Sequence, residues 1–250
     1  MSTGFESSAQ KELLSDKTSL SSKYSSLVVG QRGFFKLLRF ELINLLFSGI
    51  PAALGLVLRR TFYPCLFRNV GKGVVFGRGI TLRHPHKIVL GDNCVIDDNV
   101  VLDAKGENNE GLRIGDNVYI GRNAILSCKE GSIAVGDYTN ISANCSLLSE
   151  TEISLGRYCF LAGHCYLVAG GNHRFDDISR PIMFQPSASK GGIRIGDDVW
   201  LGAGVIVLDG ASIGPGSVVG AGAVVTATLP EYSVAVGSRR LVISDRRIIK

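Results

Sequence analysis

Aliphatic residues recur every six positions along most of the chain, and a small or short polar residue usually follows each one. Phe76 and Leu82 form an early, less regular turn of this pattern. Six groups of three regular hexads follow, beginning at Leu90, Ile114, Val135, Leu155, Ile195 and Ile213. A six-residue extended segment runs roughly 20 Å, so three segments joined by sharp corners close one triangular coil of about 18 residues. The pattern therefore predicts an all-β fold, a parallel β-helix over residues 73–229.

The fifth residue of each hexad also points inward, into a narrow space, and it is small through most of the repeat. Four of the six cysteines, Cys94, Cys145, Cys159 and Cys165, occupy this position. This placement favours small apolar core residues over catalytic or metal-binding thiols. Thirty-one glycines and an aromatic content of 8% also fit a narrow aliphatic core with many tight corners.

Residues 1–32 are polar and rich in serine, which predicts a disordered tail. They contain acidic residues and no apolar run of the kind found in a secretory signal peptide, so a reducing cytoplasmic location is expected. The net charge of +5 is too small to indicate a nucleic-acid partner, and the sequence has no basic stripe interleaved with aromatics.

Residues 33–72 are strongly apolar, and no charged side chain occurs within residues 42–58. That run is shorter than the ~20 residues that span a bilayer, and Gly49 and Pro51 interrupt it, so two short helices are predicted. Two roles stay open for the segment. It could cap the open end of the β-helix. Alternatively, residues 33–68 could make peripheral contact with a membrane, which would place the protein at its inner face.

One long interruption of the hexads is a loop over residues 173–194, which leaves the coil near His173 and returns near Arg194. Long loops on a rigid solenoid are usually functional or disordered. Residues 230–250 follow the last hexad as a C-terminal extension. Functional residues are therefore expected in the long loop.

The hexads, with GNHRFDD (Gly171–Asp177) and IGDDVWLGAGVIVLDGASIGPGSVVGAGAVVT (Ile195–Thr226), resemble the hexapeptide-repeat acyltransferases. That family includes galactoside, maltose and nodulation-factor O-acetyltransferases and the xenobiotic acetyltransferases. The resemblance covers roughly residues 76–243. It implies a left-handed parallel β-helix that forms a homotrimer, with active sites between neighbouring β-helices, acetyl-CoA as co-substrate and no metal.

In that family the histidine that His173 resembles acts as general base toward a hydroxyl of a small-molecule or glycan acceptor. Imidazole suits this role because its pKa near 6.5 leaves it largely neutral at pH 7. A backbone N–H within Trp200–Ala203 is the candidate donor to the tetrahedral oxyanion. Asn172 could hold the loop, and Asp176 and Asp177 could orient His173 or bind the acceptor, although turn residues would look the same.

The resemblance also implies a set of CoA contacts, with departures from the family pattern. The cofactor-binding candidates are Trp200, Gly202, Ala203, Ala221, Thr226, Arg239 and Arg240. Ala203 stands where relatives often carry serine, and Ala227 where they often carry a lysine that meets the CoA phosphates. Arg239 and Arg240 could supply that charge instead.

Two other functions remain open on the same fold. One is a non-catalytic rigid scaffold, against which the long histidine loop argues. The other is a zinc carbonic anhydrase, which needs three histidines converging on one metal. The four histidines, His84, His86, His164 and His173, do not show the close pair and distant partner expected for that site. The acceptor, the acyl length and the choice between O- and N-acylation are left open.

Overall fold

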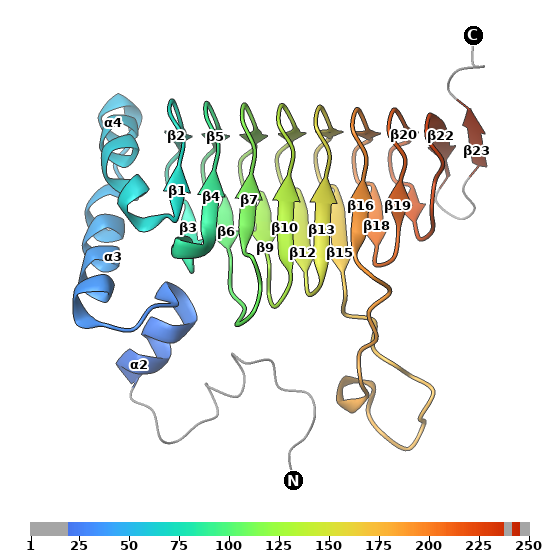
Figure 1. Ribbon diagram of the computed structural model, residues 1–250, viewed down its shortest axis with the longest axis horizontal. Helices are drawn as coiled ribbons and strands as arrows, with labels where there is room; N and C mark the ends of the chain where they lie inside the picture. Colours follow the sequence, from blue (N-terminus) through green and yellow to red (C-terminus); the bar gives the residue numbers. More distant parts are fainter. Residues whose placement is uncertain (1–19, 238–241, 246–250) are drawn as a thin grey trace.

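The computed structural model describes residues 20–237 and 242–245, and its main body is a straight prism of stacked coils (Figure 1). Three parallel sheets form its sides. Sheet A contains β1 (Asn69–Val70), β4 (Ile88–Leu90), β7 (Leu112–Ile114), β10 (Ser132–Val135), β13 (Glu152–Leu155), β16 (Ile193–Ile195) and β19 (Ser212–Ile213). Sheet C contains β3 (Thr81–Arg83), β6 (Val101–Asp103), β9 (Ile125–Ser127), β12 (Ser146–Ser149), β15 (Tyr166–Ala169), β18 (Ile206–Leu208) and β21 (Val224–Val225).

Sheet B is the third side and ends in an antiparallel strand. It contains β2 (Val75–Phe76), β5 (Val95–Ile96), β8 (Tyr119–Ile120), β11 (Asn140–Ile141), β14 (Phe160–Leu161), β17 (Trp200–Leu201), β20 (Val218–Val219), β22 (Ser233–Val236) and β23 (Val242–Asp245). The chain passes through sheets A, B and C in turn, so each coil contributes one strand to each side. The predicted left-handed parallel β-helix is confirmed.

The first hexad residues form continuous inward columns, because each strand pairs in register with its counterpart one coil away. Along sheet A, Leu90 pairs with Ile114, Ile114 with Val135, and Val135 with Leu155. These residues are all buried, and so are the four cysteines at fifth positions. The period-six pattern thus translates directly into one aliphatic core along the prism axis.

The recurring Gly-Asp and Asn residues build the corners. The Asp116 carboxylate accepts a hydrogen bond from the Asp92 amide at 2.7 Å, and the Asp137 carboxylate accepts one from the Asp116 amide at 2.8 Å. Asn93 and Asn117 take positive φ values of 55° and 56° at the next position. Asparagine tolerates this left-handed conformation better than most residues, so its recurrence marks a repeated turn.

The β-helix is longer at both ends than the predicted 73–229. Val70, Phe76 and Leu82 are the inward positions of a complete first coil that begins at Asn69. At the other end, Leu229 bridges to Ile213, and β22 adds to sheet B beyond residue 229. The first coil is hard to recognise because a 3-10 helix, η3 (Pro85–Lys87), shifts the spacing after it.

The predicted disordered tail over residues 1–32 is wrong for its second part. A short helix, α2 (Leu20–Tyr24), continues into a π-helical turn, η1 (Ser25–Val29). Val29 is buried in the core, and the His84 amide donates to the Val28 carbonyl at 2.9 Å. Residues 1–19 lie outside the described part of the chain.

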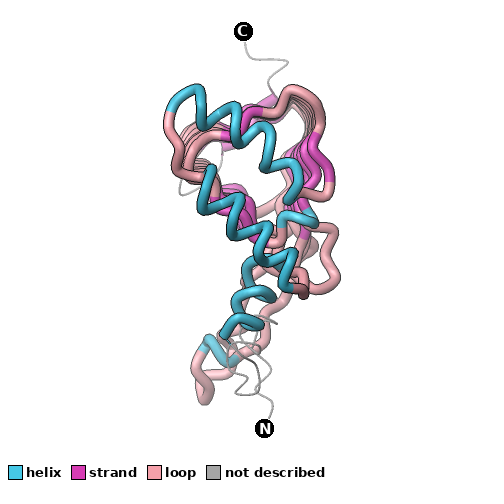
Figure 2. Tube along the Cα trace, turned by 90° about the vertical axis from the view of Figure 1, so that its left-hand side faces the viewer, coloured by secondary structure: helices cyan, strands magenta, loops and turns pink. Residues whose placement is uncertain are grey.

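Two helices, α3 (Phe34–Phe47) and α4 (Ala52–Phe62), lie across the N-terminal end of the prism, and the 3-10 turn η2 (Tyr63–Leu66) joins them to β1 (Figure 2). Phe40 and Ile43 enter the same core as Phe76. The buried Arg59 donates to the carbonyls of Phe47, Ile50 and Phe76, which ties both helices to the first coil. None of the described helices has the length and apolar character to cross a membrane.

Candidate active site

The long loop leaves the prism after β15 and returns at β16, at the edge between sheets C and A (Figure 1). Glycine pairs mark both ends, Gly170–Gly171 with φ of 106° and 72°, and Gly191–Gly192 with φ of 103° and 87°. These are backbone conformations that residues with a Cβ rarely adopt. The loop therefore spans residues 170–192, close to the predicted 173–194.

His173 lies in a short antiparallel stem at the base of this loop. It forms an isolated bridge with Ser187. The Arg174 amide donates to the Pro186 carbonyl at 2.9 Å, and the Ala188 amide donates to the Asn172 carbonyl at 2.8 Å. The stem gives the histidine backbone a defined position, although its side chain is exposed.

The ring of His173 is oriented by the opposite limb of the stem. Its Nδ1 lies 3.4 Å from the Gln185 carbonyl oxygen, a long contact. A carbonyl can only accept, so this contact requires a proton on Nδ1. In the neutral ring the lone pair is then on Nε2, which is the arrangement a general base needs.

Gln185 organises the loop beyond the stem, and sequence analysis missed it. It is only 2% exposed. Its Nε2 donates to the carbonyls of Asp177 and Arg180, at 2.8 and 3.1 Å, and its Oε1 accepts from the Asp177 amide at 3.2 Å. The residue that contacts His173 through its main chain thus also fixes the turn that follows it.

Asp209, directly after β18 in the coil that follows the loop, ties the two ends of the loop together. Its carboxylate is 3% exposed and accepts hydrogen bonds from Asn172 Nδ2 at 2.8 Å and from the amides of Lys190 and Gly192 at 2.6 and 2.8 Å. Asn172 therefore acts on the loop through Asp209. Sequence analysis missed Asp209 as well, because its partners lie 17 to 37 residues away.

Asp176 and Asp177 have partners inside the loop. The Asp177 carboxylate accepts from the hydroxyl and amide of Ser179, which hold its pKa below the ordinary value. Asp176 pairs with Arg174, whose side-chain hydrogen bond lowers the Asp176 pKa in the same way. Both carboxylates are exposed and ionised near neutral pH, and the contacts described for them serve the turn.

Most of the proposed CoA residues lie along a different edge of the prism, whereas Thr226, just after β21, lies at the edge between sheets C and A where the loop leaves. Trp200 projects outward from β17 and is 51% exposed, and it pairs in register with Phe160. Ala203 is exposed at the following corner, where its carbonyl accepts from the Gly222 amide at 2.8 Å, so Ala221 lies at the same corner one coil further on. Thr226 follows β21 and is exposed. Arg239 and Arg240 fall outside the described residues.

Two of the proposed oxyanion donors are already engaged. The Trp200 amide donates to Ser217 at 2.9 Å and the Gly202 amide donates to Val219 at 2.7 Å, both within the ladder between coils. These N–H groups have no second proton to offer, so the expectation is wrong for them. Of the four residues, Ala203 at the exposed corner is the candidate we retain.

His173 and the Ala203 corner do not meet within one chain. The corner joins sheets B and C, whereas the loop leaves from the edge between sheets C and A. One side of the prism separates these edges, about six extended residues or roughly 20 Å. Within one chain, sheet C therefore lies between the two edges.

The four histidines occupy three separate places. His84 and His86 stack with ring centroids 5.8 Å apart under the N-terminal helices. His164 has a φ of 64° at a corner, with Nε2 3.4 Å from Asn144 Nδ2, and His173 lies in the loop. Within the described residues no three His, Cys, Asp or Glu side chains converge as metal ligands. Within the described part of one chain, the histidines of the zinc alternative therefore do not come together.

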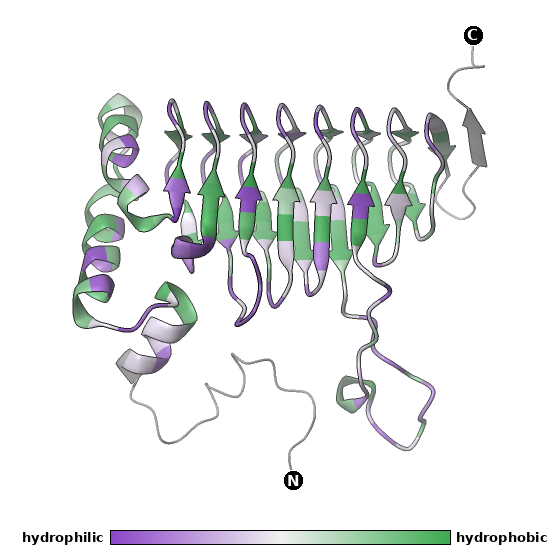
Figure 3. Ribbon diagram, viewed as in Figure 1, coloured by the Kyte–Doolittle hydropathy of each residue, from purple (hydrophilic) through white to green (hydrophobic). Residues whose placement is uncertain are grey.

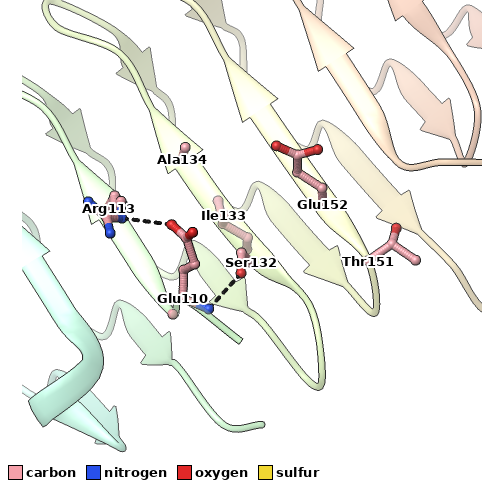
Figure 4. A pocket seen from close by; sticks show the side chains of 8 residues that line it. Glu110, Arg113, Ser132, Ile133, Ala134, Thr151 and Glu152 are labelled. Carbon is pink, nitrogen blue, oxygen red and sulfur yellow. Dashed lines mark hydrogen bonds and ion pairs between the residues drawn. The ribbon is translucent and has the colours of Figure 1, made fainter. Parts of the chain in front are cut away.

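A half-open cavity of about 290 Å³ lies on the outer face of sheet A (Figure 4). Its lining residues are Glu110, Gly111, Arg113, Ser132, Ile133, Ala134, Thr151 and Glu152. Glu110 pairs with Arg113 at 3.1 Å, so these charges largely neutralise each other. None of the residues proposed for catalysis or CoA binding lines this cavity.

Comparison with known proteins places these features in a family. The family described as bacterial transferase hexapeptide (six repeats) matches residues 192–227, and the hexapeptide repeat of succinyl-transferase matches residues 88–104 and 111–149. Probable acetyltransferase Rv3034c of Mycobacterium tuberculosis is 37% identical over 137 residues, 55% of this chain and 45% of that protein. Galactoside O-acetyltransferase of Lactococcus lactis is 35% identical over 133 residues, 50% of this chain and 58% of that protein. The chain thus carries the hexapeptide repeats of bacterial transferases and is similar in sequence to acetyltransferases.

This hexapeptide-repeat chain spans about half the length of the curated relatives it matches. Among solved structures, the polysialic acid O-acetyltransferase OatWY superposes with a TM-score of 0.57 at 23% identity, covering 73% of this chain and 85% of that one. At that identity the likeness shows the fold. The family's β-helix is therefore well established here, and the reaction has to be argued from the site.

Proposed function

We propose that this protein transfers an acetyl group from acetyl-CoA to a hydroxyl of a saccharide or related acceptor, with His173 as general base. Similarity to hexapeptide-repeat transferases supports acyl transfer, and the name of one relative, galactoside O-acetyltransferase, supports a saccharide acceptor. Because acetyl-CoA is available in the cytoplasm, we place the reaction there. The observation that carries the proposal is the stem that orients His173, with Nδ1 facing the Gln185 carbonyl.

In the proposed reaction His173 Nε2 takes the proton of the acceptor hydroxyl as that oxygen attacks the thioester carbonyl carbon. The resulting oxyanion accepts a hydrogen bond from a backbone amide, for which Ala203 is our candidate. The C–S bond then breaks, and the imidazolium returns its proton to the CoA thiolate. The products are the acetyl ester and CoA, and the histidine ends neutral as it began.

We propose that the active unit is a homotrimer in which His173 of one copy faces the Trp200–Ala203 edge of its neighbour. The roughly 20 Å between these edges in a single chain supports this arrangement. The outer faces of sheets B and C offer partly exposed apolar side chains for the contact, which are Ile125, Phe160, Tyr166 and Trp200. Exposed apolar residues grouped in this way mark an interaction surface.

The test is a His173→Ala variant assayed with acetyl-CoA against a panel of saccharide acceptors, with release of free thiol as the readout. Loss of a general base lowers kcat/KM by about 10²–10⁴-fold. We expect the Kd for acetyl-CoA to stay within twofold, and added imidazole to restore part of the rate. Arg174→Ala, on the same stem but paired with Asp176 in solvent, is the matched control.

Three results would count against this proposal. If His173→Ala retains full turnover, the histidine is not the base. If the wild-type protein releases no thiol with any acyl-CoA and acceptor, the scaffold function is favoured. If mixing His173→Ala chains with chains altered at the Trp200 edge never restores activity, the shared-site arrangement is wrong.

A further inference from the structure

The helices at the N-terminal end of the prism are apolar on two faces. The inner face of α3 carries Leu37, Phe40 and Ile43, which pack against the core. Its outer face carries a second apolar stripe at helical spacing, consisting of Phe35, Leu38, Leu42, Leu45 and Leu46. A surface helix normally has one apolar face and one polar face. The outer stripe therefore needs a separate explanation.

The outer stripe continues onto α4 and is strongly exposed. Phe35 is 83% exposed and Leu45 is 80%, and Leu54 and Val57 on α4 are 64% and 62%. Figure 3 shows hydrophobic colour along both helices, interrupted by hydrophilic segments. Figure 2 shows both helices lying across the end of the prism, so their outer surfaces face away from the β-helix. We name this surface, formed by the outward residues of α3 and α4, the end face.

Positive charge surrounds the apolar stripe of the end face. Arg32, Lys36, Arg39 and Arg60 are exposed within or beside the two helices. Between residues 20 and 68 the sequence has a single acidic residue, Glu41, and this carboxylate accepts a hydrogen bond from the Tyr24 hydroxyl at 2.6 Å. Apolar residues with a basic border and almost no acid are typical of helices that lie in the interface of an anionic bilayer.

The dimensions of α3 favour lying on a bilayer over crossing it. The helix has 14 residues, about 21 Å at ~1.5 Å per residue, against a hydrocarbon thickness of ~30 Å. The buried Arg59, which bonds to the carbonyls of Phe47, Ile50 and Phe76, holds the helices flat across the first coil. The end face is thus presented as one rigid surface.

We propose that the end face docks onto the surface of an anionic lipid bilayer, with the apolar stripe in the interface and the basic residues against the lipid headgroups. A second copy of the chain is the competing occupant. In a two-fold contact the end face of one copy packs against the end face of the other. Arg39 and Arg60 of one copy would then approach arginines of the other, with almost no acidic side chain between them. The charge of the end face therefore favours lipid. The inference is independent of the acyl transfer proposed above.

The test is sedimentation of the purified full-length protein with vesicles of 30% phosphatidylglycerol in phosphatidylcholine, beside pure phosphatidylcholine vesicles. The paired variant Phe35→Ser/Leu45→Ser removes two of the most exposed side chains of the stripe. Burial of each contributes roughly a tenfold gain in binding, so we expect the partition coefficient to fall about 100-fold. The matched control is Tyr138→Ser/Tyr158→Ser, two exposed stacked rings at a corner of the prism.

A charge variant separates the electrostatic contribution to vesicle binding from the contribution of the apolar stripe. Lys36→Gln/Arg39→Gln should lower binding to the anionic vesicles by roughly fivefold per residue at low salt and change little at high salt. Equal binding of the wild-type protein to both kinds of vesicle would overturn the role of charge. No vesicle binding by the wild-type protein, or binding that survives Phe35→Ser/Leu45→Ser, would overturn the proposal.

The oligomeric mass of the same variants distinguishes a lipid bilayer from a second copy of the chain as the occupant of the end face. If the wild-type protein ignores vesicles and Phe35→Ser/Leu45→Ser halves its mass by light scattering, the end face is a contact between copies. We expect instead that the variant keeps the mass of the wild-type protein. Its unfolding transition should also stay within a few degrees, because both side chains lie outside the core.

Discussion

The carboxylate of Asp209 offers the sharpest test of how the His173 loop is held. It is nearly buried and accepts three hydrogen bonds, from Asn172 Nδ2 and from the amides of Lys190 and Gly192. The substitution Asp209→Asn keeps the shape but replaces one acceptor oxygen by an NH₂ group. Whichever way the amide turns, that group then faces at least one of the three donors.

The magnitude follows from the bonds that are lost. A hydrogen bond to a charged group contributes about 1.5–3 kcal/mol, and a buried amide left without an acceptor adds to the cost. We therefore expect Asp209→Asn to weaken closure of the loop by about 2–4 kcal/mol. This corresponds to a roughly 30- to 1000-fold rise in the population of open loop.

Hydrogen exchange measures the population of open loop directly. The amides of Lys190 and Gly192 should lose protection by that factor, while amides in β12 (Ser146–Ser149) keep theirs. If the loop positions the base, kcat should fall more than tenfold, with the Kd for acetyl-CoA much less affected.

Asp103 provides a matched control. It is another nearly buried carboxylate at the end of a sheet C strand, where it accepts from the Lys105 amide at 3.1 Å. Asp103→Asn should loosen the neighbouring segment and leave turnover unchanged. Unaltered exchange and turnover in Asp209→Asn, or an equal loss of turnover in both variants, would refute the reasoning.

Three further predictions concern the prism itself. Thr139→Val removes a buried hydroxyl that donates to the Gly156 carbonyl at 2.8 Å and accepts from the Cys159 amide at 3.1 Å. The free energy of unfolding should therefore fall by about 1–3 kcal/mol. A lower urea midpoint at an unchanged m value would measure this loss. Cys65 is the exposed cysteine, and the other five are buried, with burial raising the pKa of Cys128 to about 12. A thiol reagent at pH 8 should therefore label one site per native chain, and none in Cys65→Ser. Burial, with smaller effects of nearby groups, lowers the pKa of His86 to about 4. The unfolded chain thus binds this proton first as pH falls from about 6.5 to about 4. Because solvent screens the partly exposed ring, the free energy of unfolding should fall by on the order of 1 kcal/mol over that window in the wild-type protein, and by less in His86→Gln.

The period-six pattern made most of the fold predictable, because it acts residue by residue along the backbone. An inward Leu90 implies an inward Ile96 six positions later, and both are fully buried. The pattern fails where local geometry departs from it. Val70 was missed as the start of the first coil because η3 disturbs the spacing after Leu82.

The N-terminal helix and the loop anchors could not be predicted in the same way. Residues 20–29 look polar, and their order depends on one buried valine, Val29, and on contacts with His84 nearly sixty residues away. Gln185 and Asp209 are ordinary polar residues in the sequence, and they become important through partners that only the fold brings near. His173 was identified through its motif, whereas the groups that orient it depend on tertiary structure.

The regular stacking of the coils has a consequence for distance. Four steps in sheet C, from β3 to β15, separate the coil beneath the N-terminal helices from the coil where the loop leaves. At ~4.8 Å per step, this height is about 19 Å. This height depends on the number of coils and very little on their side chains. The coil count therefore sets the distance between the N-terminal helices and the loop. Deleting one whole coil between these levels would bring the imidazole ~4.8 Å nearer to the helices.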